Sequence, residues 1–450
     1  MSPTEVRAIL EGMGLRPSRS LGQNFLCDGN VARWIVEQLE PDPEDVVIEV
    51  GPGLGALTEH LAGKVRRLVL LELDRRMAAR LRENYGNDDT VEVIEGDATA
   101  ADLRGYFAEQ PVKMIGNLPY SAGGEIIRAF LRQPTPVSRA VLMLQKEVGE
   151  RLQAVPGTKS YGILSLRVQA EWDVQQVKLV GPDVFVPRPD VDSAVLRLDC
   201  RAPDAFPPHD RVLFDRLVRQ GFSQRRKQLK KLLPEAAGRW EELTGALEVP
   251  GTVRGEELGL EQWVALTNLL DDHPQKDMHR AGSEEEVFDV VNNEDEVVGQ
   301  EKRSIVHAKG LKHRAVHLFV FNRAGDLYLQ KRTAVKDVHP NRWDSSAAGH
   351  LDSGESYDEA AVRELGEELG ISGELEVFGK LSPCEDTGWE FVQFYRVEHD
   401  GKGIRLSARE IAYGEYFPVG VVDAWVERRP EDFATGFLAG WRLYRGGGLG

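Results

Sequence analysis

The chain has 450 residues, of which 41% are hydrophobic and 29% are charged, and its formal net charge is −17. This length provides for two or three globular domains, and the longest apolar runs fall far short of a membrane span. The acidic balance argues against a nucleic-acid partner for the chain as a whole. A basic segment can still bind phosphates, because salt limits charge effects to about 8 Å.

The cysteines and the N-terminus both indicate a cytoplasmic protein. Cys27, Cys200 and Cys384 lie far apart and lack the spacing of a metal site, so we expect reduced thiols. The N-terminus has no basic start followed by an apolar stretch, and so shows no sign of export.

Short apolar runs alternate with amphipathic segments from residue 46 to about residue 200. The predicted strands are 46–50, 68–73, 91–95, 112–116 and 140–144, and the predicted helices are about 55–63, 75–84 and 122–132. This alternation predicts an α/β fold with a mostly parallel, doubly wound, Rossmann-like sheet. We assign residues 1–206 to this domain.

The rest of the chain divides into four further segments. A helical pattern predicts a small lobe over 207–271, and the polar stretch 272–286 is the expected linker. Strand patterns and one strong helix, at about 355–369, predict a second α/β domain over 287–430. We expect 431–450 to be a C-terminal tail.

Three glycines and two acids follow the predicted strands in order. Gly51, Gly53 and Gly55 come after the first strand, where glycine lets the backbone approach a ligand closely. Glu72 ends the next strand, 21 residues after Gly51, where a ribose diol would bind. Asp97 ends the third strand, where it would accept a hydrogen bond from an adenine amine. Either acid by itself is explained as a strand cap or a surface charge. The glycines and the two acids together, in this order along the chain, predict a site for a cofactor that contains a nucleoside.

NLPY at 117–120 ends the fourth strand, beside the crevice expected at that edge of the sheet. The exocyclic amine of a base is a poor nucleophile, because its lone pair is delocalised into the ring. The Asn117 side-chain oxygen and the Leu118 carbonyl would each accept one amine hydrogen and aim the lone pair at a methyl donor. Pro119 would stiffen the loop and Tyr120 would stack on the base. Such a site works by positioning and polarisation and needs no metal.

Eight segments in order resemble the small-subunit (16S) ribosomal RNA adenine dimethyltransferases, over about residues 15–270. They are QNFL (23–26), EVGPGLGALTE (49–59), ELD (72–74), GDA (96–98), NLPY, LQKEV (144–148), FVPRPDVDS (185–193) and FSQRRKQLKK (222–231). The resemblance implies a Rossmann-like methyltransferase that uses S-adenosylmethionine. It also implies dimethylation of two adjacent adenosines in the hairpin loop near the 3′ end of 16S ribosomal RNA.

The resemblance also implies roles for individual residues. The expected cofactor contacts are Asn24, Leu26, Gly51, Glu72, Asp97 and Asn117. Phe185 would pair with Tyr120 to sandwich the flipped adenine, and together with Asn117 and Leu118 these form the expected catalytic set.

Eight basic residues lie between residues 211 and 231, against a single acid, Asp215. The resemblance implies that Arg225, Arg226, Lys227 and Lys230 grip the RNA backbone; the alternative is a solvated helix face. Two other readings of the N-terminal part stay open. One is a 23S ribosomal RNA dimethylase of the macrolide-resistance type, and the other is a ribosome-assembly factor that binds without catalysis.

A second, unrelated pattern spans residues 349–371, GHLDSGESYDEAAVRELGEELGI, and matches the Nudix box. Glu364, Glu367 and Glu368 stand at i, i+3 and i+4, so they share one helix face. Crowded carboxylates repel unless a cation joins them, and their oxygens suit Mg²⁺ or Mn²⁺. We expect Arg363 to pair with Glu355. The resemblance implies an α/β/α Nudix sandwich that hydrolyses a small diphosphate, with Glu364 in catalysis.

Overall fold

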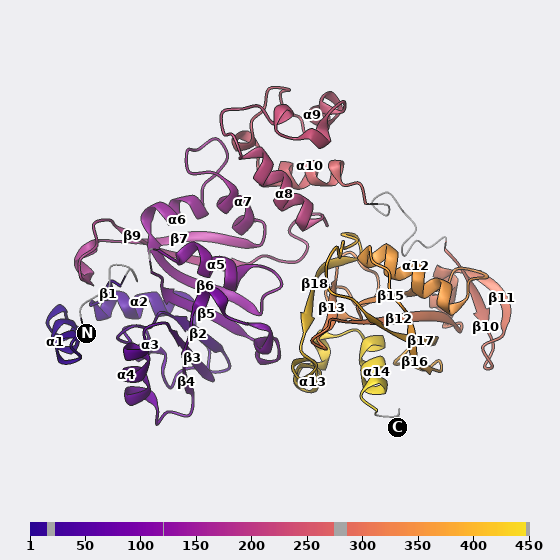
Figure 1. The fold of residues 1–450 in the computed structure, drawn as a ribbon, viewed down its shortest axis with the longest axis horizontal. Helices are drawn as coiled ribbons and strands as arrows, with labels where there is room; N and C mark the ends of the chain where they lie inside the picture. Colours follow the sequence, from indigo (N-terminus) through magenta and orange to yellow (C-terminus); the bar gives the residue numbers. More distant parts are fainter. Residues whose placement is uncertain (16–22, 120, 274–285, 447–450) are drawn as a thin grey trace. The chain divides into compact units, whose positions relative to one another are not determined.

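The computed structural model describes residues 1–15, 23–119, 121–273 and 286–446 (Figure 1). The chain divides into two compact units. One comprises 1–202, 218–234 and 249–262, and the other comprises 203–217, 235–248 and 263–450. Across the described residues, no helix combines the length and hydropathy needed to span a membrane. Most of the expected linker lies outside these residues, and the expected boundaries between the five segments stay a prediction.

A seven-stranded sheet in the order β4-β3-β2-β5-β6-β9-β7 forms the centre of the first unit. Its strands are β2 (Val46–Val50), β3 (Arg67–Glu72), β4 (Val91–Glu95), β5 (Val112–Asn117), β6 (Val137–Gln145), β7 (Trp172–Val180) and β9 (Ser193–Cys200). The first five pair in parallel, whereas β9 pairs antiparallel with both β6 and β7. The expected α/β fold with a parallel sheet is therefore confirmed, and β7 and β9 extend it.

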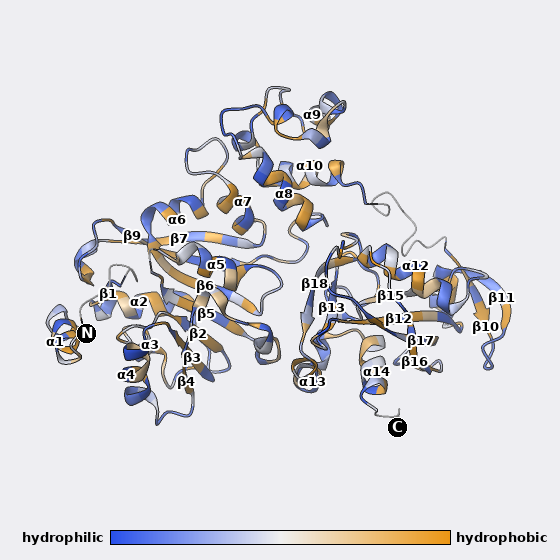
Figure 2. Cartoon of the chain, in the orientation of Figure 1, coloured by the Kyte–Doolittle hydropathy of each residue, from blue (hydrophilic) through white to orange (hydrophobic). Residues whose placement is uncertain are grey.

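Helices pack around this sheet (Figure 1). They are α1 (Pro3–Gly12), α2 (Gly29–Leu39), α3 (Thr58–Leu61), α4 (Arg75–Tyr85), α5 (Gly123–Leu131), α6 (Lys146–Leu152), α7 (Ile163–Gln169), and the 3₁₀ turns η1 (Ala98–Ala100), η2 (Arg104–Glu109) and η3 (Pro182–Val184). Figure 2 shows hydrophobic residues concentrated on β5 and β6, whereas α4 is largely hydrophilic. The Asp28 and Asp74 carboxylates cap α2 and α4 by accepting backbone N–H groups of the first turn.

Helices and turns fill the segment expected as a helical lobe. They are α8 (Arg211–Gly221), η4 (Leu229–Lys231), η5 (Pro234–Ala236), α9 (Trp240–Ala246), η6 (Gly255–Glu257) and α10 (Leu260–Leu270). Residues 222–226 form consecutive turns rather than a helix. Arg225 and Arg226 therefore lie on an irregular segment, whereas Arg211, Arg216 and Arg219 lie on α8, so the alternative of a solvated helix face stays open for that part of the stretch.

The second unit is built on another seven-stranded sheet, in the order β14-β13-β12-β17-β16, with β15 paired to β12 and β18 to β13. Its strands are β12 (His313–Phe321), β13 (Leu327–Arg332), β14 (Trp343–Asp344), β15 (Ala347–His350), β16 (Glu376–Leu381), β17 (Glu390–Glu398) and β18 (Ile411–Phe417). A separate hairpin joins β10 (Val287–Val291) to β11 (Val297–Lys302). β12 and β17 run parallel, which brings the first residues of both strands to one edge.

Helices α11 (Arg303–Lys309), α12 (Tyr357–Leu369), α13 (Val419–Arg428) and α14 (Thr435–Tyr444), with the turn η7 (Pro430–Asp432), accompany this sheet. Ser356 and Glu359 form a capping box at the start of α12, and Gly370 ends it in the left-handed conformation. Leu365 of α12 packs with Leu318 of β12, whereas Phe437 of α14 packs on Phe319. Neighbouring residues of a strand face opposite sides, so the helices cover both faces and the α/β/α sandwich is confirmed.

The expectation of a C-terminal tail over 431–450 is wrong for residues 435–444. These residues form α14, in which Phe437 and Trp441 are buried. The two aromatic residues are four apart, so they share one helix face, and their packing on the sheet compensates for the short length of the helix.

Candidate functional site

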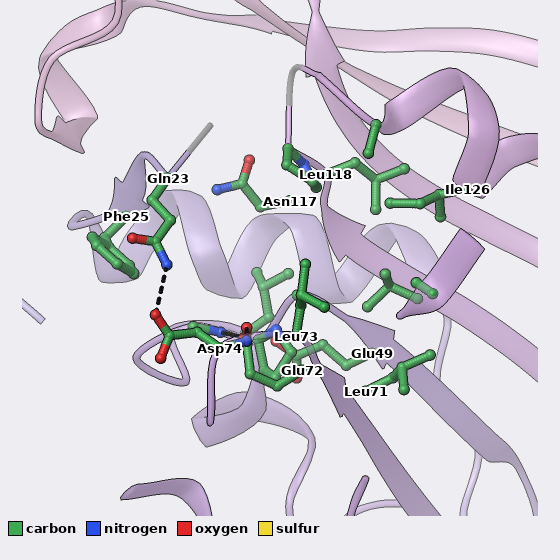
Figure 3. Close-up of a pocket in the computed structure, with 18 of the residues that line it drawn as sticks. Gln23, Phe25, Glu49, Leu71, Glu72, Leu73, Asp74, Asn117, Leu118 and Ile126 are labelled. Carbon is green, nitrogen blue, oxygen red and sulfur yellow. Dashed lines mark hydrogen bonds between the residues drawn. The ribbon is translucent and has the colours of Figure 1, made fainter. Parts of the chain in front are cut away.

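A pocket lies at the carboxyl end of strands β2, β3, β4 and β5 (Figure 3). The residues that line it come from the glycine turn, the strand ends and the segment before α2: Gln23, Asn24, Phe25, Leu26, Glu49, Val50, Gly51, Pro52, Gly53, Leu54, Ala56, Leu57, Leu71, Glu72, Leu73, Asp74, Gly96, Asp97, Ala98, Thr99, Asn117, Leu118, Pro119, Ala122 and Ile126. All six residues expected to contact the cofactor are among them. The structure thus brings together residues that lie up to 93 positions apart along the chain.

The glycine turn after β2 shapes the floor of this pocket. Gly51 and Gly53 have φ values of +65° and +57°, which residues with a side chain adopt only at a cost. A Cβ on Gly53 would also lie 3.1 Å from the ring of Phe25. These two positions therefore need glycine for both backbone conformation and space.

Glu72 fastens the glycine turn to the end of β3. One of its carboxylate oxygens accepts the Gly53 N–H at 2.9 Å, and the other accepts the Asp74 N–H at the same distance. Burial raises the pKa of Glu72, while these backbone donors lower it. In Figure 3, Glu72 and Asp74 lie on one side of the pocket, and Gln23 and Asn117 lie on the other.

Asn117 is held in a defined orientation at the end of β5. Its side-chain nitrogen donates to the Asn24 carbonyl at 2.9 Å, and a carbonyl can only accept, so the amide cannot be turned around. The Asn117 side-chain oxygen and the Leu118 carbonyl accept no hydrogen bond from any residue that the structure describes. Two acceptors next to each other in sequence are thus available at the pocket.

Asp97 keeps one carboxylate oxygen for a ligand. Its Oδ1 accepts both the N–H and the hydroxyl of Thr99, each at 2.8 Å, and these bonds lower the pKa of Asp97. Its Oδ2 has no such partner among the described residues. An ionised carboxylate with one open oxygen suits the amine that we expect it to bind.

The two aromatic residues expected to sandwich a base are not both seen at the pocket. Tyr120 lies outside the described residues. Phe185 is in β8 (Phe185–Val186), paired opposite Leu26 of β1 (Phe25–Leu26), and only 3% of its surface is exposed. It packs in the apolar core and does not line the pocket, so stacking would require it to move.

Glu49 lines the same pocket, and the sequence reasoning did not single it out. It accepts a hydrogen bond from the Thr58 hydroxyl at 2.7 Å. Burial raises the pKa of Glu49 to about 8, and the charge of Glu72 adds to this shift. The signal in the sequence is a carboxylate within the apolar run VVIEV.

Replacing Glu49 with glutamine should weaken the pH dependence of stability. An unfolded glutamate titrates near 4.5 and Glu49 in the fold near 8, so only the folded chain keeps this proton between those values. The free energy of unfolding therefore falls as the pH rises through this window. Glutamine does not titrate, so between about pH 5 and pH 8 the Tm of Glu49→Gln should fall less than that of the wild type.

Calorimetry measures the Tm of the unit that contains Glu49, in the wild type and the variant, across this pH range. Glu37→Gln, which changes an exposed residue on α2, is the control. Equal falls in Tm for the wild type and Glu49→Gln would contradict the assignment of a neutral carboxyl group at this position.

The four residues expected to bind RNA are all exposed, but they are not equivalent. Arg225 donates to the Glu256 carboxylate and to the Thr158 carbonyl, the latter at 3.0 Å. It therefore ties the turn to its surroundings. The side chains of Arg226, Lys227 and Lys230 form no ion pair with any residue that the structure describes, so their charges remain available for phosphate groups.

In the second unit, Arg363 organises the predicted carboxylate site. It forms two hydrogen bonds with Glu355, at 2.8 and 2.9 Å, which confirms the expected pair. It also donates to Glu364 at 2.7 Å, to Glu367 at 3.1 Å and to the His350 carbonyl at 2.9 Å. One guanidinium group thus connects the loop, the helix and the end of β15.

The carboxylates of α12 face a polar pocket. Burial and the neighbouring Glu368 raise the pKa of Glu364 to about 8, and burial raises the pKa of Glu368 to about 7. Glu368 accepts the Ala348 N–H at 3.0 Å. A Cβ on Gly349 would lie 2.0 Å from Glu364, so glycine is required there.

Each of the three glutamates has one carboxylate oxygen with no hydrogen-bond partner in the described part of the chain. Three open carboxylate oxygens on one helix face are the donor set that a hard divalent cation prefers, and a bound cation would favour the ionised form of each. The residues present therefore fit a Mg²⁺ or Mn²⁺ ion.

A family model for ribosomal RNA adenine dimethylase matches residues 15–272. The chain belongs to the ribosomal RNA adenine dimethylase family. A NUDIX domain model matches residues 311–434, so this dimethylase family member carries a second domain. The "Ribosomal RNA small subunit methyltransferase A" of Geobacter metallireducens is 42% identical over 271 residues, covering 58% of this chain and 98% of that protein. The protein of the same name from Ligilactobacillus salivarius is 40% identical, covering 60% and 95%.

Solved structures resemble each half of this dimethylase family member. The 23S rRNA methyltransferase ErmE is 28% identical with a TM-score of 0.45, covering 55% of this chain and all of that one. DR0079 from Deinococcus radiodurans is 30% identical with a TM-score of 0.31, covering 36% of this chain and 98% of that one.

Proposed function

We propose that the N-terminal part dimethylates two adjacent adenosines in the 3′-terminal hairpin loop of 16S ribosomal RNA, in the cytoplasm, with S-adenosylmethionine as the donor. The observation that carries this proposal is the fixed Asn117 amide beside the glycine turn. Two relatives at 40% and 42% identity bear the name of a small-subunit ribosomal RNA methyltransferase, which favours the 16S substrate over the 23S substrate.

The residues of the pocket fit S-adenosylmethionine. The glycine turn leaves room where a Cβ would clash, and Glu72 and Asp97 offer carboxylates at the positions expected for the ribose and the adenine. When bound, this cofactor supplies an electrophilic methyl group. The Asn117 oxygen and the Leu118 carbonyl would hold the two hydrogens of the adenine amine and direct its lone pair, and no metal is needed for this step.

Methylation of isolated ribosomal particles tests the substrate. Undermethylated 30S and 50S particles are incubated separately with the full chain and labelled S-adenosylmethionine. Label in the 16S RNA of the 30S particle is expected, as dimethylated adenosine. Label on 50S particles alone would identify a 23S enzyme, and binding to 30S particles without transfer would identify an assembly factor.

The exposed cations should contribute to RNA binding through charge alone. Changing Arg226 and Lys227 to alanine should weaken binding to 30S particles and make it less dependent on salt. The slope of log K against log salt should become shallower by about 0.7–0.9 for each phosphate that is no longer neutralised. Binding measured at several salt concentrations gives this slope. Lys64→Ala, an exposed site after α3, is the control; an unchanged slope in the double variant would place the RNA elsewhere.

We further propose that the C-terminal part hydrolyses a small diphosphate with Mg²⁺ or Mn²⁺ held by Glu364, Glu367 and Glu368. Such an ion, when bound, neutralises phosphate charge and activates water. Arg363 holds Glu364 and Glu367 in place, and the buried Glu364 carboxylate is a candidate to accept a proton from water. The NUDIX domain match and the open carboxylate oxygens support this proposal.

A further inference from the structure

Four side chains outside the Nudix helix converge at one edge of the second sheet. His313 begins β12, Glu390 begins β17 directly opposite it, and His350 ends β15 on the other side of β12. His307 reaches the same place from α11. Each side chain offers one ligand atom, and these four atoms all lie within 4.8 Å of one another.

The spacing of the three imidazole rings matches a shared metal ion. Imidazoles bound tetrahedrally, at a zinc–nitrogen distance of about 2.0–2.1 Å, have ring centres about 5.2 Å apart. The ring centres of His313 and His350 are 5.1 Å apart, and His307 lies 5.4 Å from His313 and 5.5 Å from His350. The three rings are thus nearly equally spaced, and one nitrogen of each lies within 4.8 Å of the others.

His313 lies between a carbonyl and a carboxylate. Its Nδ1 lies 3.0 Å from the Leu311 carbonyl, which can only accept, so Nδ1 carries a hydrogen. Its buried Nε2 lies 3.2 Å from a Glu390 oxygen, without the geometry of a hydrogen bond. A cation bound between Nε2 and this oxygen would satisfy both atoms. A histidine ligand whose other nitrogen donates to a carbonyl is the usual arrangement around bound zinc.

One aromatic ring packs against the cluster, and Arg303 lines the same pocket as His307 and His350. The Phe288 ring stacks on His313, with ring centres 5.5 Å apart and 4° between the planes, and lies 4.6 Å from the His350 ring. The same Glu390 oxygen lies 2.9 Å from His350 Nε2. This oxygen therefore lies within 3.2 Å of a nitrogen of both His313 and His350.

We propose that His307, His313, His350 and Glu390 bind one zinc ion through ligands other than the carboxylates of α12, in the same pocket that those carboxylates line. Three nitrogens and one carboxylate favour zinc over magnesium, and four protein ligands complete a tetrahedral shell, which is typical of structural sites. The ion would join α11 to three strands. It would also fix His350, whose carbonyl accepts a hydrogen bond from Arg363.

Metal content tests this proposal independently of any hydrolase activity. The full chain is expressed without a polyhistidine tag, reconstituted with Zn²⁺, separated from loosely bound metal and analysed by mass spectrometry. About one zinc per chain is expected in the wild type and in Glu367→Gln. His307→Ala should lose it; because His307 is exposed on α11, circular dichroism and methyl transfer should remain normal.

Two further measurements complete the test. Co²⁺ in place of zinc should give tetrahedral visible absorption in the wild type but not in His307→Ala. His399→Ala, which changes a histidine at the far end of β17, should keep the metal. Zinc absent from the reconstituted wild type, or equal in His307→Ala, would overturn the proposal. So would its loss from Glu367→Gln with retention in His307→Ala.

Discussion

Asn117→Ala should reduce the rate of methyl transfer to 30S particles by about 10²–10³-fold, the usual effect of removing one preorganised polar group from a reacting centre. Alanine removes the side-chain oxygen that would hold the adenine amine, and it also removes the donor that fixes Asn117 to the Asn24 carbonyl. Single-turnover transfer of labelled methyl groups measures the reduction. The effect should appear mainly in kcat, because the hydrogen bond to the amine matters most in the transition state.

A matched control separates this effect from a general loss of structure. Asn30→Ala changes an exposed asparagine on α2 that does not line the pocket, and it should leave transfer unaltered. Donor binding by calorimetry shows whether Asn117→Ala still assembles the pocket. Transfer within about twofold of the wild type in Asn117→Ala would remove amine polarisation from the mechanism.

Glu367→Gln should lower metal-dependent hydrolysis by at least about 100-fold, since even residues that only support a ligand cost 10–100-fold when changed. Glutamine keeps the shape of the side chain and an oxygen for Arg363, but it removes the negative charge. A panel of nucleoside and prenyl diphosphates with Mg²⁺ or Mn²⁺ first identifies a substrate of the wild type. Release of phosphate or nucleotide from that substrate then measures the variant.

Glu374→Gln, an exposed position after α12, is the control and should hydrolyse at the wild-type rate. Equal rates in Glu367→Gln and the wild type would exclude Glu367 as a ligand. A wild type that hydrolyses no member of the panel with either metal would make the C-terminal part a binding module.

The parallel core of the first sheet could be predicted from the sequence. Five apolar runs in order, with glycine and acidic residues at their ends, are compatible with few other folds. The antiparallel pair β7 and β9 was missed. In β7, exposed and buried residues alternate irregularly around a bulge between Gln176 and Lys178, so the sequence shows no clean period of two.

Interactions between distant parts of the chain account for what the sequence could not show. The Arg363–Glu355 pair spans eight residues and was predicted, whereas the Asn117–Asn24 hydrogen bond spans 93 and depends on the folded sheet. The His and Glu390 cluster has no spacing motif, because its members come from one helix and three strands. The core position of Phe185 likewise follows from the pairing of β1 with β8.

Arg363 also has a consequence for the second unit in the absence of the metal ion proposed at α12. Its positive charge lies among the carboxylates of Glu355, Glu364 and Glu367 and reduces their mutual repulsion, so we expect α12 to fold without a divalent ion. Removal of the ion proposed at these carboxylates should therefore leave the domain folded and resistant to proteases, while the proposed hydrolysis stops. Adding the ion back should restore hydrolysis without refolding.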